Sequence, residues 1–153
     1  MQLGVQFLAR RDRTAVQVER YLLSKGASSL QARQIVRRLS DLHYLNDCDY
    51  AQRWIDKRLV SRPMGQERLK VELRAKGIAE TLANQVIADV FREINEEALA
   101  CRALKAARCR GRRLTRSQTV RFLHQRGFSE ETIDRMIEKF RIDEESVYEE
   151  QRD

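Results

Sequence analysis

The sequence predicts an all-α protein made of three tandem three-helix repeats that form an elongated, curved, solenoid-like body. Its 153 residues contain one proline, Pro63, and six glycines, which are fewer turn residues than a β-rich fold of this size usually needs. One short sequence pattern also occurs three times, at offsets of 51 and then 50 residues. Repeats of this length bury little surface alone, so they stack on one another and share a core.

Each copy of the pattern is an amphipathic segment that ends in a basic residue and a glycine. Leucine occupies the same place in all three copies, at Leu22, Leu73 and Leu123. A helix commonly ends in a left-handed turn that only glycine enters freely, so the closing glycines are predicted helix ends. The copies are 14–26 (TAVQVERYLLSKG), 65–77 (GQERLKVELRAKG) and 115–127 (TRSQTVRFLHQRG), closing at Gly26, Gly77 and Gly127.

An apolar helical register continues after each glycine, with matching residues at i, i+3, i+4 and i+7. The matching sets are Ala32, Ile35, Val36 and Leu39; Ala83, Val86, Ile87 and Val90; and Ile133, Met136, Ile137 and Phe140. The helices before each copy align less well, through Leu3, Trp54 and Leu104 and then Leu8, Leu59 and Cys109. We therefore expect Trp54 to be a core anchor rather than a ring on which a base stacks.

The elements follow in order from these registers. We expect helices near 2–11, 14–24 and 29–42 in the first repeat, 47–61, 65–75 and 80–94 in the second, and 96–109, 115–125 and 129–141 in the third. Ser28 or Ser29, Asn46 or Asp47, and Ser129 are suited to cap helices, because their side-chain oxygens accept hydrogen bonds from the first free amides. The predicted repeats are 1–45, 46–94 and 95–142, followed by an acidic tail over 143–153.

Charge is unevenly distributed along the chain. The net charge is +7, but residues 143–153 carry six acids and one arginine, a net of −5. Residues 1–142 therefore carry 29 basic and 17 acidic residues, a net of +12. A basic body indicates contact with nucleic acid or a nucleoprotein surface, and the alternative is that charge only keeps a helical protein soluble.

The residues that usually carry catalysis are sparse. His43 and His124 are the two histidines, and no HExxH, GxSxG or GxxxxGK[ST] motif occurs, so we predict neither an enzyme nor a bound cofactor. The number and spacing of Cys48, Cys101 and Cys109 fit no zinc pattern, so we expect no metal and reduced thiols, with Cys101 and Cys109 buried. No apolar run approaches the roughly 20 residues of a membrane span, so we expect a cytoplasmic protein.

Basic residues gather where the first helix of each repeat ends and where the copied segments end. Arginine pairs well with phosphates and carboxylates, so these residues form the predicted partner-binding surface. The alternative is that cations merely favour helix C-termini. That effect explains one or two basic residues per helix, but not the five arginines between 108 and 116. Stacked repeats would align several of them along one side. The predicted surface residues are Arg10, Arg11, Arg58, Arg62, Arg74, Lys76, Arg110, Arg112, Arg113 and Arg126.

Several segments resemble the RecX family. Residues 44–58 (YLNDCDYAQRWIDKR) are similar to the family's GYLDD..FA..FV..R stretch, with His43 where the family usually has glycine. Residues 65–78 resemble G..RI..EL..KGI, and residues 122–128 resemble YL..RGF. The opening, residues 7–11 (FLARR), also resembles the start of family members. The middle block is the specific part, because several unusual residues recur there at fixed distances.

This resemblance, over about residues 3–141, implies a regulator of the RecA recombinase. Family members bind the filament of RecA on single-stranded DNA along its helical groove and interfere with filament growth, ATP hydrolysis and strand exchange. The resemblance therefore implies the RecA filament as the partner, with single- or double-stranded DNA as a further direct partner. We expect no membrane partner and a monomeric chain.

Two other classes of function stay open from the residues alone. The first is a free-standing, basic DNA-binding protein whose units act like helix-turn-helix modules. Its recognition helix would be 29–42, which offers Gln31, Gln34, Arg37 and Arg38. The second is a general helical scaffold that binds a protein partner and has no effect on RecA.

Overall fold

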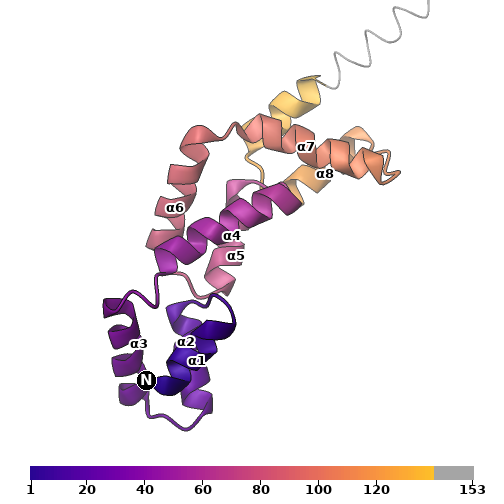
Figure 1. Ribbon diagram of the computed structural model, residues 1–153. Helices are drawn as coiled ribbons and strands as arrows, with labels where there is room; N and C mark the ends of the chain where they lie inside the picture. The colour runs from indigo at the N-terminus through magenta and orange to yellow at the C-terminus, as the bar shows by residue number, and fades with distance from the viewer. Residues whose placement is uncertain (140–153) are drawn as a thin grey trace, which may run out of the picture. The chain divides into compact units, whose positions relative to one another are not determined.

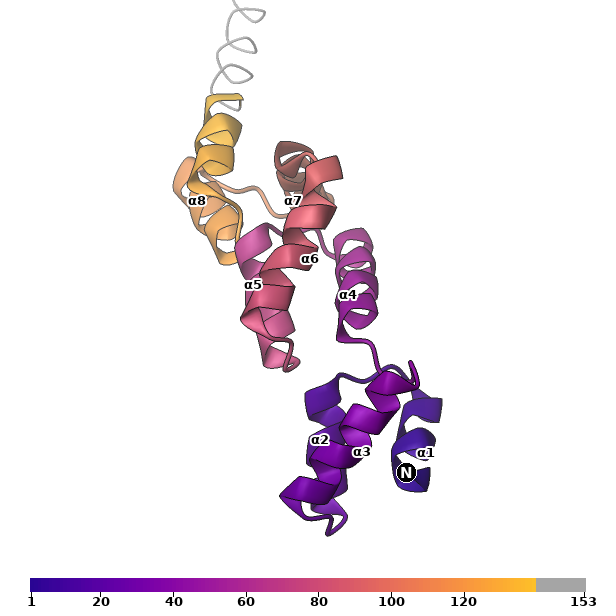
Figure 2. The same cartoon turned by 90° about the vertical axis from the view of Figure 1, so that its left-hand side faces the viewer.

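The computed structural model describes residues 1–139, and this part of the chain is helical with no strand (Figures 1 and 2). The helices are α1 (Gln2–Arg10), α2 (Ala15–Ser24), α3 (Ser29–Asp41), α4 (Asp47–Ser61), α5 (Gln66–Ala75), α6 (Glu80–Glu93), α7 (Glu96–Cys109) and α8 (Arg116–Gln125), followed by a helix over 130–139. The bounds of α1 to α8 lie within one residue of the predicted ones, and the all-α fold of three-helix repeats is confirmed. Phe140 and the acidic segment 143–153 lie outside the described residues.

The chain divides into two compact units that do not coincide with the repeats. The first unit contains Met1–Ile55 and Lys70–Ala88, and the second contains Asp56–Leu69 and the chain from Asp89 onward. Helices α4, α5 and α6 therefore contribute residues to both units.

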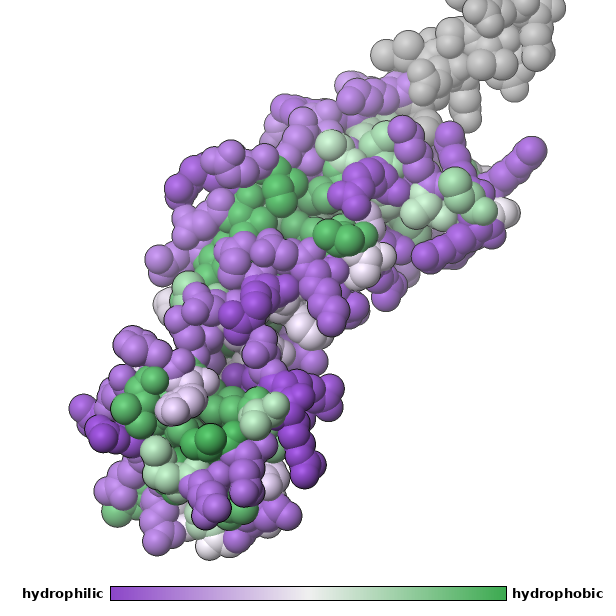
Figure 3. Space-filling model, viewed as in Figure 1, coloured by the Kyte–Doolittle hydropathy of each residue, from purple (hydrophilic) through white to green (hydrophobic). Residues whose placement is uncertain are grey.

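Helices α1, α2 and α3 form the core of the first repeat, inside the first unit. The buried residues of this core are Val18, Leu22, Ala32, Leu39 and Leu45. Gly4 is the buried residue of α1, and a Cβ there would lie 2.9 Å from Leu39 Cδ1, so α1 approaches α3 closely because it carries no side chain at this point. The predicted core position Leu3 is wrong, since Leu3 is 47% exposed and Gly4 takes its place. Hydrophobic residues accordingly reach the surface over this repeat in Figure 3.

Two further predictions of burial are wrong. Trp54 is only partly buried, while the neighbouring Ile55 is fully buried, so the core-facing stripe of α4 is displaced by one residue from the aligned position. The Trp54 ring instead stacks beside Tyr50 and lies under the Lys76 ammonium, which is 4.4 Å from the ring centroid. Cys109 is exposed at the last residue of α7, beyond the packed turns of that helix.

Cys101 is partly exposed rather than buried, because the buried stripe of α7 is formed by its neighbours. That stripe consists of Leu99, Ala100, Ala103, Leu104 and Ala107. Cys48, Cys101 and Cys109 are free thiols in this structure.

The predicted helix ends take the expected conformations. Gly26, Gly77 and Gly127 have φ of 90°, 86° and 74°. Ser28 caps α3, accepting a hydrogen bond from the amide of Gln31. Asn46 accepts from the amides of Cys48 and Asp49, and Ser129 accepts from the amide of Thr132. His43 has φ of 59°, a left-handed conformation that glycine adopts more freely than other residues.

A polar joint connects the first and second repeats within the first unit. The buried Thr14 hydroxyl at the start of α2 donates a 2.7 Å hydrogen bond to the carbonyl of Lys76, in the turn after α5. The amide of Ala15 donates to the Asp47 carboxylate at 2.9 Å. Burial raises the pKa of Asp47, and the Ala15 amide lowers it in part. The following repeat thus bonds the first amide of α2, while Thr14 itself bonds the amide of Gln17.

A corresponding contact, which we call the second joint, connects the second and third repeats within the second unit through different groups. The contact between the first and second repeats is the first joint. At the start of α5 the amide of Gly65 donates to the Arg126 carbonyl at 2.9 Å, and the amide of Glu67 donates to the Gly127 carbonyl at 3.2 Å. The Glu96 carboxylate lies 3.5 Å from the amide of Gln66, as Asp47 lies beside Ala15 in the first joint. A Cβ at Gly65 would overlap the carbonyl of Gly127, so the second joint requires glycine for space.

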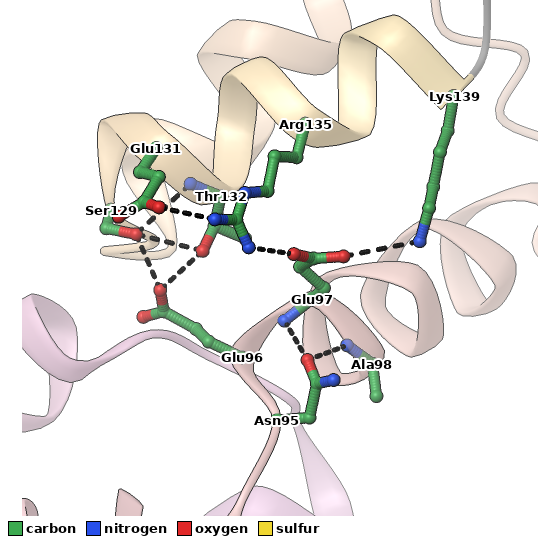
Figure 4. A network of polar contacts seen from close by, with 9 residues as sticks. All are labelled: Asn95, Glu96, Glu97, Ala98, Ser129, Glu131, Thr132, Arg135 and Lys139. Atoms are coloured by element: carbon green, nitrogen blue, oxygen red, sulfur yellow. Dashed lines mark hydrogen bonds and ion pairs between the residues drawn. The ribbon is translucent and has the colours of Figure 1, made fainter.

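Polar contacts from the start of α7 hold the helix over 130–139 in the second unit (Figure 4). Glu96 accepts hydrogen bonds from the hydroxyls of Ser129 and Thr132, both at 2.7 Å. Glu97 pairs with Arg135 at 2.6 Å and with Lys139 at 3.3 Å. Hydrogen bonds from Arg135 and then Lys139 lower the pKa of the Glu97 carboxyl. One pair of adjacent glutamates therefore contacts both ends of this helix.

Gly65→Ala tests the second joint. A methyl group at Gly65 must displace the 127 carbonyl, and overpacking of this kind costs about 1–3 kcal/mol, so we expect a loss near the upper end of that range. Gly26→Ala is the matched control, because a Cβ there meets nothing within 4 Å and only the φ of 90° is unfavourable, at about 1 kcal/mol. Urea unfolding measures both. A larger loss of unfolding free energy for Gly26→Ala than for Gly65→Ala would show that the close contact at Gly65 does not limit stability.

The Glu97 contacts predict an acid-dependent loss of stability. Because the folded pKa of Glu97 lies below its usual 4.5, the pairs stabilise the fold above that pH, and this contribution disappears as pH falls through the folded pKa. Glu97→Gln should therefore be less stable than the parent at neutral pH and equal to it in strong acid. Thermal unfolding against pH measures this difference. A constant difference across the whole range would show that charge on Glu97 is irrelevant.

Candidate anion-binding site

Six arginines converge on one pocket in the second unit. The pocket has a volume of about 990 Å³, and we name it the arginine pocket. Its arginines are Arg62, Arg68, Arg112, Arg113, Arg121 and Arg126. The remaining lining residues are Met64, Gly111, Leu114, Gln118, Phe122 and Gln125, so the lining holds no acidic residue.

Three segments far apart in the sequence bring these arginines together. The first is the end of α4 with the start of α5, which carries Arg62 and Arg68. The second is the loop after α7, where the amide of Arg112 bonds back to the Ala107 carbonyl at 3.1 Å and Gly111 has φ of 77°. Glycine just past a helix end permits this turn, which directs the chain of Arg112 and Arg113 away from α7.

The third segment is α8, whose pocket-lining residues follow the helical repeat. Gln118, Arg121, Phe122 and Gln125 are spaced i, i+3, i+4 and i+7, which places them on one face of the helix. A capping box at Thr115, completed by Gln118, begins this helix. The face that lines the pocket is therefore set by the local sequence of α8.

Arg126 connects the arginine pocket to the second joint. Its Nη1 donates to the Pro63 carbonyl at 3.0 Å, and its guanidinium lies 4.6 Å from the centroid of the Phe122 ring. Its own carbonyl accepts the hydrogen bond from Gly65. Burial lowers the pKa of Arg126, and the positive charges of Arg62, Arg110 and Arg112 lower it further. The guanidinium stays charged, so this direction reports its burial first and the crowding of like charges second.

Four of the pocket arginines lack the carboxylate partners that surface arginines have elsewhere. Within residues 1–139, Arg62, Arg112, Arg113 and Arg121 form no ion pair with a carboxylate. Attraction to helix C-termini does not account for Arg68, which stands near the N-terminus of α5, where the helix dipole disfavours a cation. A concave cluster of cations without internal anions is suited to binding an anionic partner.

The structure separates the predicted surface residues into groups. Arg62, Arg112, Arg113 and Arg126 line the arginine pocket, and Arg110 is close enough for its charge to act on Arg126. Arg10, Arg11 and Arg74 are exposed in the first unit, and Lys76 covers the Trp54 ring there. Arg58 is partly buried and does not line the pocket. Alignment of arginines from all three repeats along one side stays a prediction.

Sequence reasoning missed Arg68 and Arg121. The spacing of Gln118, Arg121 and Gln125 on α8 was a signal for one polar face, but nothing local indicated that Arg68 faces the same space. Within the described residues, no three His, Cys, Asp or Glu side chains are grouped as metal ligands would be. None of the helices in this part of the chain has the length and apolar character needed to cross a bilayer.

Comparison with known proteins decides the family. Residues 46–87 match the family model described as RecX, second three-helix domain. The Regulatory protein RecX of Treponema pallidum (strain Nichols) is 30% identical over 109 residues, which are 71% of this chain and 66% of that protein. The Regulatory protein RecX of Pelodictyon phaeoclathratiforme is 28% identical over 87% of this chain and 83% of its own length. The chain belongs to the RecX family.

The fold agrees with solved RecX structures. The crystal structure of RecX from Lactobacillus salivarius has a TM-score of 0.79 at 22% identity, covering 92% of this chain and 94% of its own. The matches do not always span the whole relative: in the Treponema pallidum protein they cover less than two thirds, and in the Bacillus pumilus RecX they cover 54%. These relatives are named regulatory proteins rather than enzymes.

Arg62→Gln tests the crowding of charge in this RecX-family chain. Removing one of the cations that act on Arg126 should stabilise the fold at low salt by roughly 0.2–1 kcal/mol, and salt should abolish the gain by screening the repulsion. Arg53→Gln is the matched control, because Arg53 pairs with Asp12 at 2.9 Å and its loss should not stabilise the fold. Urea unfolding at two salt concentrations measures both. A destabilising Arg62→Gln would mean that its charge has a favourable partner.

Proposed function

We propose that this RecX-family chain binds the filament of RecA on single-stranded DNA and inhibits filament growth, ATP hydrolysis and strand exchange by RecA. Membership of a family of regulatory proteins supports this function. The observation that connects the proposal with particular residues is the arginine pocket, whose lining contains six arginines and no acidic residue. In this proposal the pocket forms part of the contact with the filament.

The chemistry of the pocket fits a nucleoprotein partner. Each guanidinium presents several N–H donors in a fixed plane, which matches the oxygens of phosphates and carboxylates. A filament of protein on DNA exposes both kinds of anion. Because the chain acts by occupying a surface, it needs no catalytic group or cofactor of its own. A partner that works on DNA also makes the cytoplasm the expected site of action, and the chain is expected to act as a monomer.

A free-standing DNA-binding protein is the alternative. Gln34, Arg37 and Arg38 of α3 are exposed, as a recognition helix would require. Gln31, however, is part of the capping box with Ser28, so one of its four candidate contacts already serves the start of the helix. Binding to one preferred duplex sequence, with no effect on RecA, would favour this alternative.

RecA-dependent ATP hydrolysis on single-stranded DNA tests the proposed function. Protein added below the RecA concentration should slow hydrolysis, because a block to growth at a filament end affects many subunits. Addition of this protein to DNA without RecA should produce no hydrolysis. An unchanged rate with equimolar protein would reject the proposal.

A triple variant tests the contribution of the basic loop after α7. Arg110→Ala, Arg112→Ala and Arg113→Ala change exposed positions, so together they should leave helical content intact, each costing within about 0.5 kcal/mol. The variant should bind the filament more weakly and with less dependence on salt, since fewer counterions are released. Leu73→Ala should instead cost about 2–5 kcal/mol, because Leu73 is fully buried, and leave the surface chemistry unaltered.

A filament-binding titration at two salt concentrations, with circular dichroism as the folding control, compares these variants. If the triple variant binds like the parent at both concentrations, the loop arginines do not contribute to filament binding.

A further inference from the structure

We propose that the arginine pocket binds adjacent phosphate groups, and that its occupancy tightens the second joint through Arg126. This inference deepens the proposed function by naming the chemistry that the pocket recognises. It also concerns an effect inside the chain, since it connects a surface site to the contact between α5 and the turn after α8. Its test contains no RecA, so it can fail or succeed independently of filament regulation.

The density of charge favours phosphates over the side-chain carboxylates of a protein partner. Arg62, Arg112, Arg113 and Arg121 come from three segments and face one space without a carboxylate partner within residues 1–139. To neutralise them together, a ligand must place several negative charges close to one another. A nucleic-acid strand carries one charge per about 3.4 Å along its axis, and an inorganic polyphosphate carries its charges on directly linked groups. Carboxylates on a protein surface are separated by whole side chains.

The apolar part of the pocket indicates that phosphates, rather than bases, are recognised. The obvious stacking ring in the lining is Phe122, and it is 9% exposed, with the Arg126 guanidinium 4.6 Å from its centroid. A base therefore has no free aromatic face to stack on in this pocket. Binding should accordingly be insensitive to nucleotide sequence and strongly sensitive to salt.

Arg126 couples the pocket to the joint. Its guanidinium lines the pocket, its Nη1 bonds to Pro63, and its carbonyl accepts the amide of Gly65. The positive charges of Arg62 and Arg112 repel the Arg126 guanidinium in this arrangement. A phosphate cluster that neutralises these charges stabilises the arrangement. If the ligand binds only while the hydrogen bonds of the second joint are formed, its binding must also stabilise those hydrogen bonds, and more so the tighter it binds.

Hydrogen exchange of the joint amides in the full chain tests the coupling. The probes are inorganic tripolyphosphate and a single-stranded oligothymidine, each compared with sodium chloride at the same ionic strength. Saturating probe should slow exchange of the amides of Gly65 and Glu67 by about tenfold or more. The amide of Ala15, in the first joint, is the internal control and should not change, because none of the residues that line the arginine pocket bonds it.

Two charge-matched variants locate the effect. Arg112→Ala with Arg113→Ala removes two pocket cations, and the affinity for tripolyphosphate should fall about tenfold or more, since hydrogen bonds to charged groups are among the stronger ones. Arg10→Ala with Arg11→Ala removes the same charge from exposed residues that do not line the pocket, and affinity should fall much less. Circular dichroism confirms the folding of both variants.

Protection of Gly65 and Glu67 by both probes supports a site for phosphate groups in general. Protection by oligothymidine alone supports the same chemistry with a nucleic-acid strand as its source, and protection by tripolyphosphate alone makes a free polyphosphate the source. No specific protection by either probe overturns the inference. Equal slowing at Ala15, or an equal loss of affinity in the two double variants, also overturns it.

Discussion

The free amides at the start of α5 are the constraint on which the second unit depends. A helix start leaves backbone N–H groups without partners inside the helix, and buried groups of this kind must be bonded elsewhere. Here the Arg126 and Gly127 carbonyls of the next repeat accept the amides of Gly65 and Glu67. Because the backbones meet directly, the contact leaves no room for a side chain at Gly65. The position of Arg126, and with it one wall of the arginine pocket, follows from this contact.

The first and second joints lie at corresponding positions of their repeats, but different chemical groups form them. Thr14 stands 51 residues before Gly65, and it bonds to the Lys76 carbonyl through its side chain rather than its amide. Asp47 and Glu96 are the first residues of α4 and α7, and each directs a carboxylate toward the first amide of the preceding repeat's second helix. A carboxylate at a helix start is also favoured by the helix dipole. Helices that follow one apolar register can therefore be joined by different polar groups.

Local features of the fold could be predicted from the sequence because their causes are local. The bounds of α2 and α8, for example, follow from an apolar register, a capping residue and a closing glycine, all within one short segment. The failures concern contacts between segments. Leu3 and Cys109 fit the register, but the close approach at Gly4 and the end of packing at Ala107 decide their exposure.

The candidate site was predictable only in part for the same reason. Crowded arginines after α7 indicated a basic surface, and Arg62, Arg112, Arg113 and Arg126 do line one pocket. The contribution of Arg68 depends on how α5 meets the turn after α8, which is set by the second joint. Charge patterns thus identified the kind of surface, while backbone contacts between repeats determined which cations share it.

The turn after α8 caps the start of α5 through its backbone. Scalar coupling across hydrogen bonds, measured by nuclear magnetic resonance between the amide nitrogen of Gly65 and the carbonyl carbon of Arg126, tests this contact directly. We predict a detectable coupling for this pair and for Glu67 with Gly127, comparable to the couplings within α5. Absence of both couplings, in a spectrum where those of α5 are resolved, would contradict it.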